Sequence, residues 1–85
     1  MTKTTAEVIV DLTRIFYEVL NSESIQLDYG TTAQDVKGWD SLNHIELVLA
    51  IEEHFAIRFN FAELQKFKNV GEMADNIVVK LASKG

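Results

Sequence analysis

Apolar residues recur at helical spacing in three long stretches of the chain and in one short stretch. In the first stretch, apolar side chains occupy one side from Ile9 to Val19, and charged side chains occupy the other. A hydroxyl at Thr4 and a carboxylate three residues later at Glu7 have the spacing of a capping box, which marks a helix start. The sequence therefore predicts an amphipathic helix that begins after Thr4 and ends near Asn21.

Turn-forming and polar residues dominate the next segment, residues 21–40. A segment of this length without regular structure is unusual in a small domain and is often functional. Four side chains within it are expected to hold it against the helices: Ile25, Leu27, Tyr29 and Val36.

The second predicted helix runs from Ser41 to His54 or Phe55 and has two different faces. At about 100° per residue, five side chains gather on one arc, which is expected to face the core: His44, Leu47, Val48, Ile51 and Phe55. The opposite arc alternates leucine with glutamate: Leu42, Glu46, Leu49 and Glu53. A solvated face needs no leucine and a core face needs no glutamate. The mixture is typical of a face that binds a partner with an apolar patch ringed by lysine or arginine.

The remainder of the chain predicts a connector and two further helices. Residues 56–59 are expected to insert Ile57 and Phe59 into the core. Cap spacing at Asn60 predicts a short helix over about 61–66, and the same pattern at Asn69 predicts a last helix with an apolar face. The predicted fold is all-α: a small four-helix bundle with a short third helix and a long loop between the first two helices.

Composition narrows the class of protein. The 85 residues predict a single domain over 1–85, and 47% hydrophobic residues suffice for a packed bundle. The sequence has no proline and four glycines, which favours helices over a turn-rich β fold. It has no cysteine, which excludes disulfides, thiol catalysis and cysteine-ligated metal sites.

Charge and hydropathy indicate what the protein binds. Thirteen acidic and eight basic residues give a net charge of −5, which disfavours nucleic acid and favours partners with basic patches. Between Lys37 and Arg58 there is no lysine or arginine. Glu52 and Glu53 lie near the C-terminal end of the second helix, where its dipole disfavours negative charge, so an intermolecular role is expected for them. No signal peptide is recognisable, and the longest uncharged apolar run, residues 47–51, is far too short for a membrane span. A soluble, cytoplasmic monomer is expected.

Ser41 stands where the long loop becomes the second helix. Aspartate and serine are both common helix caps, so Asp40 and Ser41 could have a purely structural role. Asp40 can cap the helix alone, however, which would leave the Ser41 hydroxyl free. The first turn of a helix also favours an anion, so a phosphodiester on Ser41 would be stabilised there.

A catalytic or metal-binding role for this region is not supported by the sequence. A nucleophilic serine needs a nearby base that a third group orients. His44 is expected on the core side with a loop carbonyl as its partner, and His54 is expected to be exposed. The two histidines lack a third metal ligand close by. Trp39 could cover the core or border Ser41, and both interpretations stay open.

The order of these features resembles the acyl carrier proteins over the whole chain. The resemblance is carried by Asp40-Ser41-Leu42, by Glu-Glu-x-Phe at the end of the second helix (residues 52–55), and by residues 69–73 at the start of the last helix. It implies that Ser41 is esterified with 4′-phosphopantetheine, which a phosphopantetheinyl transferase takes from coenzyme A. The thiol of this arm would hold acyl intermediates as thioesters for enzymes of fatty-acid, lipid or polyketide-type synthesis, so the chain would not itself be an enzyme.

The resemblance also assigns roles to further positions. Five match residues that such carriers present to basic partner enzymes: Asp40, Leu42, Glu46, Leu49 and Glu53. Five match the lining of a cavity for the acyl chain: Val48, Ile51, Phe59, Leu64 and Phe67.

The sequence departs from carriers of bulk fatty-acid synthesis in its third helix. This helix has one acidic residue, Glu63, and Lys66 and Lys68 lie at and just after its end. Together with Trp39 before the Asp-Ser pair, this is similar to stand-alone carriers of specialised acyl pathways. Two alternative interpretations stay open. The chain could be a peptidyl or aminoacyl carrier, or an unmodified acidic interaction module.

Overall fold

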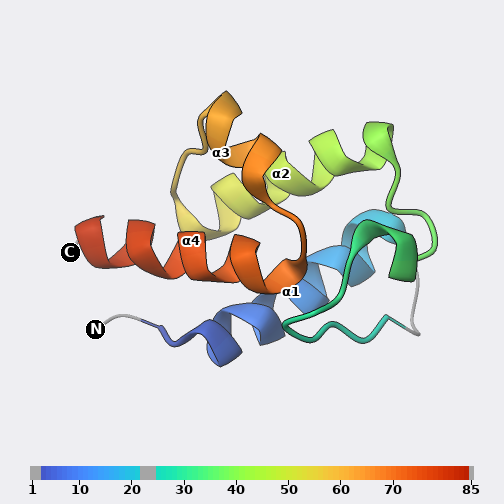
Figure 1. The fold of residues 1–85 in the computed structure, drawn as a ribbon, viewed down its shortest axis with the longest axis horizontal. Helices are drawn as coiled ribbons and strands as arrows, with labels where there is room; N and C mark the ends of the chain where they lie inside the picture. The colour runs from blue at the N-terminus through green and yellow to red at the C-terminus, as the bar shows by residue number, and fades with distance from the viewer. Residues whose placement is uncertain (1–2, 22–24, 85) are drawn as a thin grey trace.

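The computed structural model describes residues 3–21 and 25–84 and has four α-helices. Figure 1 shows α1 and α4 side by side with α2 across them, and the short α3 beside α2. This arrangement confirms the predicted all-α fold and its short third helix. The elements are α1 (Thr5–Leu20), a 3-10 turn η1 (Ala33–Asp35), α2 (Ser41–Phe55), α3 (Phe61–Lys66) and α4 (Val70–Lys84).

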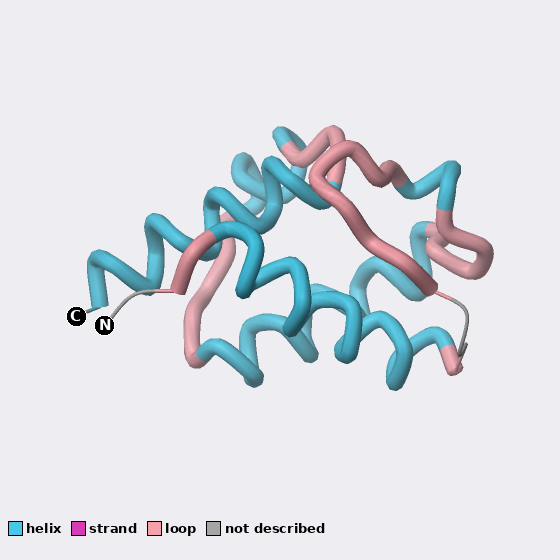
Figure 2. The backbone as a smooth tube through the Cα atoms, turned by 90° about the horizontal axis from the view of Figure 1, so that it is seen from below, coloured by secondary structure: helices cyan, strands magenta, loops and turns pink. Residues whose placement is uncertain are grey.

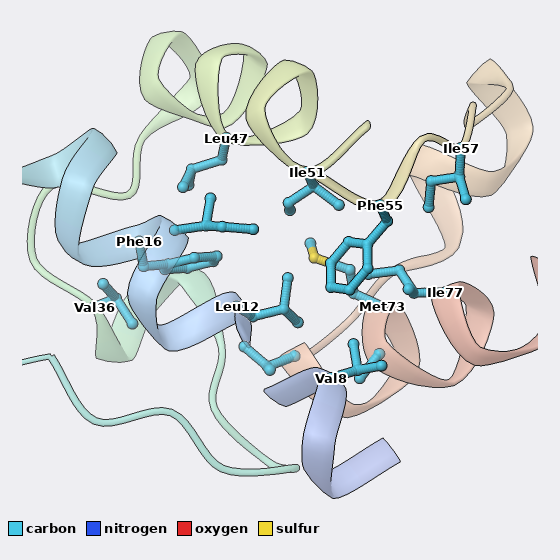
Figure 3. Packing of buried hydrophobic residues seen from close by; sticks show 13 residues of the cluster. Val8, Leu12, Phe16, Val36, Leu47, Ile51, Phe55, Ile57, Met73 and Ile77 are labelled. Carbon is cyan, nitrogen blue, oxygen red and sulfur yellow. The ribbon is translucent and has the colours of Figure 1, made fainter. Parts of the chain in front are cut away.

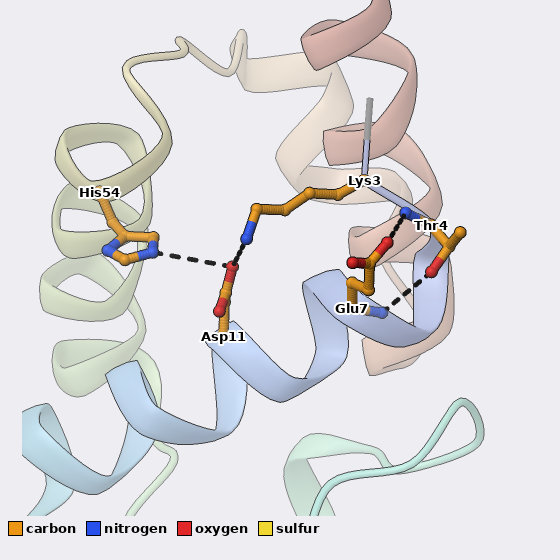
Figure 4. Close-up of polar contacts among 5 residues, drawn as sticks. All are labelled: Lys3, Thr4, Glu7, Asp11 and His54. Carbon is orange, nitrogen blue, oxygen red and sulfur yellow. Dashed lines mark hydrogen bonds and ion pairs between the residues drawn. The ribbon is translucent and has the colours of Figure 1, made fainter. Parts of the chain in front are cut away.

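Each predicted cap is present at its helix. At α1, the Glu7 N–H donates to the Thr4 hydroxyl and the Thr4 N–H donates to the Glu7 carboxylate (Figure 4). Asn60 and Glu63 form the same capping box at α3. At α4, the Glu72 N–H donates to the Asn69 side chain at 2.8 Å. These bonds satisfy backbone donors that would otherwise lack partners, so they fix where the helices begin.

The core lies between α1, α2 and α4, and α1 packs against both of the other helices. Figure 3 shows the core side chains of α2 above those of α1 and α4. The predicted core arc of α2 is confirmed for four residues, and His44 is half-buried at its edge. The buried hydrophobic residues are Val8, Leu12, Ile15, Phe16, Val36, Leu47, Val48, Ile51, Phe55, Ile57, Val70, Met73, Ala74 and Ile77.

An ion-pair cluster connects α1 to the end of α2. Asp11 accepts a hydrogen bond from the Lys3 ammonium at 2.7 Å and lies 3.8 Å from His54 Nε2 (Figure 4). His54 is exposed, as the sequence predicted. The cluster is at the surface, so it contributes little to stability.

The long segment after α1 runs back beside the second half of α1 and reaches the start of α4, as Figure 2 shows in pink. The segment was predicted to be irregular over residues 21–40, of which 22–24 lie outside the described residues. The 3-10 turn η1 interrupts the rest of it. The segment is attached to the start of α4 because Thr31 and Tyr29 carbonyls accept from the Val70 and Gly71 N–H groups, each at 2.8 Å. Val36 is buried, whereas Ile25 and Leu27 are half-buried against the core.

Tyr29 connects this segment to α4 through both its hydroxyl and its ring. Its hydroxyl donates to Asp75 at 2.7 Å, and Asp75 also accepts from the Thr5 hydroxyl at 2.7 Å. The Thr5 and Tyr29 hydrogen bonds lower the pKa of Asp75. The Tyr29 ring lies over Gly71, where a side chain would overlap it. One carboxylate therefore joins α1, the long segment and α4.

We expect Gly71→Ala to lower the free energy of unfolding by about 1–3 kcal/mol, because the new methyl group would displace the Tyr29 ring. Urea denaturation followed by circular dichroism measures this change. Gly30→Ala is the matched control, because a methyl group there would meet no atom closer than 3.8 Å. Equal losses in the two variants would contradict the role assigned to the Tyr29 contact.

The short helix α3 is attached to α4 mainly through Glu63. The Glu63 carboxylate accepts from the Asn60 N–H at 2.8 Å and from the Asn76 side chain at 3.0 Å, and pairs with the Lys80 ammonium at 2.8 Å. The hydrogen bond from Lys80, with those from Asn60 and Asn76, lowers the pKa of Glu63 to about 2. Because α3 has no fully buried residue, the contacts with Asn76 and Lys80 help to hold it against α4.

Candidate functional site

Ser41 is the first residue of α2 and its side chain is exposed. Asp40 is the N-cap, and its carboxylate accepts from the Asn43 N–H at 2.8 Å. The prediction that Asp40 caps the helix alone is therefore confirmed. The Ser41 hydroxyl makes no hydrogen bond with any residue in 3–21 or 25–84. It is thus available for modification.

The turn before Ser41 is held by its own hydrogen bonds. Gly38 adopts a φ of 91°, a left-handed conformation that residues with side chains rarely adopt. Its carbonyl accepts from the Asn43 side chain at 2.6 Å and from the Asp40 N–H at 3.1 Å. The position of Ser41 is therefore fixed by the residues on both sides of it.

Trp39 and His44 form a hydrogen-bonded pair beside Ser41. The Trp39 indole N–H donates to His44 Nδ1 at 3.0 Å, and the two rings are stacked with centroids 6.0 Å apart. The expected loop carbonyl partner of His44 was wrong, because its side chain is paired with the Trp39 indole among the described residues. Trp39 also packs against Phe16, with the two rings nearly perpendicular and their centroids 4.9 Å apart. Trp39 thus both covers the core and borders the serine.

The described residues do not form a catalytic or metal centre around Ser41. His44 Nδ1 accepts from Trp39, and burial lowers the pKa of His44, so the ring is a neutral acceptor there. His54 is engaged near Asp11 at the other end of α2. Residues 3–21 and 25–84 contain no group of three side chains able to hold a metal ion. Within the same residues, no helix has the length and hydropathy needed to cross a membrane.

A cavity of about 480 Å³ lies beside Ser41, between α2, α3 and the start of α4. Its apolar part comes from Trp39, Leu64 and Phe67, and its rim carries charged and polar groups. The full lining is Ala33, Trp39, Asp40, Ser41, His44, Leu64, Phe67, Lys68 and Asn69.

Only part of the predicted acyl-cavity lining belongs to this cavity. Leu64 and Phe67 line it, but Val48 and Ile51 are buried in or against the core of the bundle. Phe59 packs edge-on against Phe67, with ring centroids 5.5 Å apart, and is not part of the lining. Trp39, His44 and Lys68 were not assigned to a cavity from the sequence, because no periodic pattern relates the loop to α3.

The predicted docking residues form one exposed surface along α2, which we call the α2 stripe: Asp40, Leu42, Glu46, Leu49 and Glu53. Leu42 is 73% exposed and Leu49 is 59% exposed, although both are apolar. Ile45, which is 60% exposed, adds a third apolar side chain that sequence reasoning missed. Its position three residues after Leu42 and four before Leu49 was the available signal.

The structure assigns a local role to Glu52, for which the sequence had favoured an intermolecular one. Its carboxylate accepts from the Phe59 N–H at 2.8 Å and so holds the connector against the end of α2. That interpretation was therefore wrong for Glu52. Glu53 is exposed and stays part of the α2 stripe.

Comparison with known families and proteins gives concordant matches. The family model described as "Phosphopantetheine attachment site" matches residues 10–77. An acyl carrier protein of Helicobacter pylori is 33% identical over 69 residues, which cover 79% of this chain and 86% of that protein. An acyl carrier protein of Cyanidium caldarium is 43% identical over 47 residues, 55% of each chain.

The fold is also similar to a solved structure. The solution NMR structure of a holo acyl carrier protein from Geobacter metallireducens superposes with a TM-score of 0.85 at 45% sequence identity. The match covers 91% of this chain and 88% of that one.

Proposed function

Because this chain belongs to the phosphopantetheine-attachment family and is an acyl carrier protein, we propose that Ser41 is its attachment residue and that the α2 stripe docks its partner enzymes. The observation that carries this proposal is the exposed Ser41 hydroxyl, which has no partner among the described residues and borders a cavity. When attached, 4′-phosphopantetheine supplies a terminal thiol that holds an acyl group as a thioester.

The surroundings of Ser41 fit this group. Asp40 takes over the capping role, so modification of the hydroxyl removes no hydrogen bond from the helix. The first-turn N–H groups of α2 and its dipole favour the negative charge that a phosphodiester brings. The cavity volume of about 480 Å³ lies in the range of small-molecule sites.

The attachment reaction requires an external catalyst. The Ser41 oxygen would form the bond to the phosphorus of the pantetheine phosphate, while the bond from that phosphorus to the adenosine bisphosphate part of coenzyme A breaks. The hydroxyl proton must go to a base, and His44 Nδ1 is occupied by the Trp39 indole. A phosphopantetheinyl transferase is therefore the first partner that this site requires.

The proposed attachment is tested by incubating the protein with coenzyme A, magnesium and a broad-specificity phosphopantetheinyl transferase. The intact mass should then increase by one phosphopantetheine group. A wild-type protein that gains no mass under conditions in which another carrier is loaded would refute the proposal.

The α2 stripe has the composition expected for reversible docking. Its leucines offer apolar area at the centre, and Glu46 and Glu53 offer charge to a basic partner. On α3, by contrast, Glu63 is already paired with Lys80. We therefore infer that partner enzymes bind α2 rather than α3. This inference supports a role in a specialised acyl pathway. The pathway and a cytoplasmic location stay predictions.

We expect Glu46→Lys and Glu53→Lys each to lower kcat/KM for loading by the transferase by about tenfold at low salt, mainly through KM, because electrostatic attraction is replaced by repulsion. Glu18→Lys makes the same charge change on the exposed face of α1 and is the matched control. At high salt the kcat/KM values of the two α2 variants and of the control should become similar, because salt screens these charges. A helical circular dichroism signal that collapses in the α2 variants would instead show that these glutamates are structural.

A further inference from the structure

The cavity beside Ser41 has a cation on its rim that the fold does not use. Lys68 lines this cavity together with Ser41 and lies between α3 and α4. Its side chain is exposed, and it makes no ion pair with any carboxylate in 3–21 or 25–84. Lys68 therefore does not stabilise the bundle through a salt bridge, although it lies at the proposed attachment site.

No other basic side chain of the described chain has both properties. Lys3 and Lys80 are held in ion pairs with carboxylates. Lys37 and Lys66 are exposed but do not line the cavity. The position of Lys68 is thus distinct from that of its sequence neighbour Lys66, two residues earlier.

We propose that Lys68 is a positioning residue that holds the phosphodiester carried by Ser41 and directs the attached arm over the cavity face formed by Trp39 and Phe67. This inference rests on the proposed function of Ser41 and adds to it the residue that orients the arm. The ligand group that Lys68 would bind is a singly charged phosphodiester, whose charge complements the ammonium group.

A cation on the rim would offset a repulsion that the site contains. Asp40 adjoins Ser41 on the same rim, and its carboxylate would repel a phosphodiester. One Asp40 oxygen is directed to the Asn43 N–H, so this charge is fixed close to Ser41. The ammonium of Lys68 offsets the repulsion from the cavity side.

The direction of the arm follows from the shape and chemistry of the rim. Trp39 and Phe67 give the cavity an apolar face, whereas the α2 stripe leads away along the outside of α2. A phosphate held by Lys68 places the following part of the arm over the apolar face. The arm would then be partly shielded until a partner enzyme withdraws it.

The experiment compares loaded wild type, Lys68→Gln, Lys68→Arg and Lys66→Gln, each brought to complete loading as judged by intact mass. The ³¹P chemical shift of the phosphodiester is measured between about 0.01 and 1 M NaCl, where the Debye length falls from about 30 to about 3 Å. Wild type, Lys68→Arg and Lys66→Gln should show a salt-dependent shift. Lys68→Gln should resemble high-salt wild type at all salt concentrations.

Fluorescence of Trp39, the sole tryptophan, gives a second readout of arm position. Loading should change its emission in wild type, and the change should fall roughly two- to fivefold in Lys68→Gln, as expected for loss of an exposed ion pair. Lys66→Gln should retain the wild-type change.

The outcomes separate this inference from the proposed function. If wild type is not loaded, the proposed function fails and the inference fails with it. If all four proteins load and Lys68→Gln matches Lys66→Gln in both readouts, the attachment stands and the assignment of Lys68 is overturned.

Discussion

Ser41→Ala should gain no mass when the protein is incubated with coenzyme A, magnesium and a phosphopantetheinyl transferase. The serine oxygen is the only atom that changes, and without it no phosphodiester can form at this position. The loss should be complete rather than partial, because an alanine methyl group offers no nucleophile. Intact-mass spectrometry measures the result directly.

The structure also predicts that Ser41→Ala folds normally. Asp40 caps α2, and the Ser41 hydroxyl has no partner among the described residues, so stability should change by no more than about 0.5 kcal/mol. Ser83→Ala, which removes an exposed hydroxyl from α4, is the matched control and should load like wild type. Mass gain by the Ser41 variant would place the attachment elsewhere, whereas failure of both variants would indicate a general defect.

Phe16→Ala should produce the largest loss of stability that we predict, about 3–5 kcal/mol. Phe16 is the largest of the fully buried side chains. Its ring packs against that of Trp39, so the variant loses a packing contact next to the site as well as core volume. A chain of this length has a total stability of roughly 4–13 kcal/mol, so the variant would be partly unfolded or close to it.

Urea titration with Trp39 fluorescence and circular dichroism measures the effect of Phe16→Ala on the site and on the helices together. Val10→Ala is the control on the same helix, because Val10 is 66% exposed and its truncation leaves no cavity. Its stability should stay within about 0.5 kcal/mol of wild type. A loss below about 1 kcal/mol for Phe16→Ala would contradict the packing described for the core.

The helices were predictable because their signals are local. Cap residues and apolar spacing both act within a few positions. They marked the start of α3 at Phe61 correctly and placed the end of α2, at Phe55, to within one residue. The same local logic identified Asp40 as a cap that acts without Ser41. Helix geometry alone also gave four members of the exposed α2 stripe, Leu42, Glu46, Leu49 and Glu53, and the resemblance added Asp40.

The cavity was harder to predict because its walls come from separate elements. Whether Ile51 faces the cavity or the core depends on how α1 packs under α2, which no short sequence pattern encodes. The Trp39–His44 hydrogen bond likewise depends on the path of a loop. Glu52 was misread because its partner, the Phe59 N–H, lies beyond the end of the helix.

The attachment of α3 through Glu63 determines how low the pH can fall before this wall of the cavity is released. The pKa of Glu63 is lowered from its ordinary value of 4.5 to about 2, so folding favours its charged form. The contribution of the Glu63 carboxylate to the free energy of unfolding is therefore complete above about pH 4.5 and is lost as the pH falls towards 2. Leu64 adjoins Glu63 and lines the cavity, so mild acidification should leave the wall in place. Strong acid would release it from α4, whereas the apolar core, which does not titrate, would still hold α2.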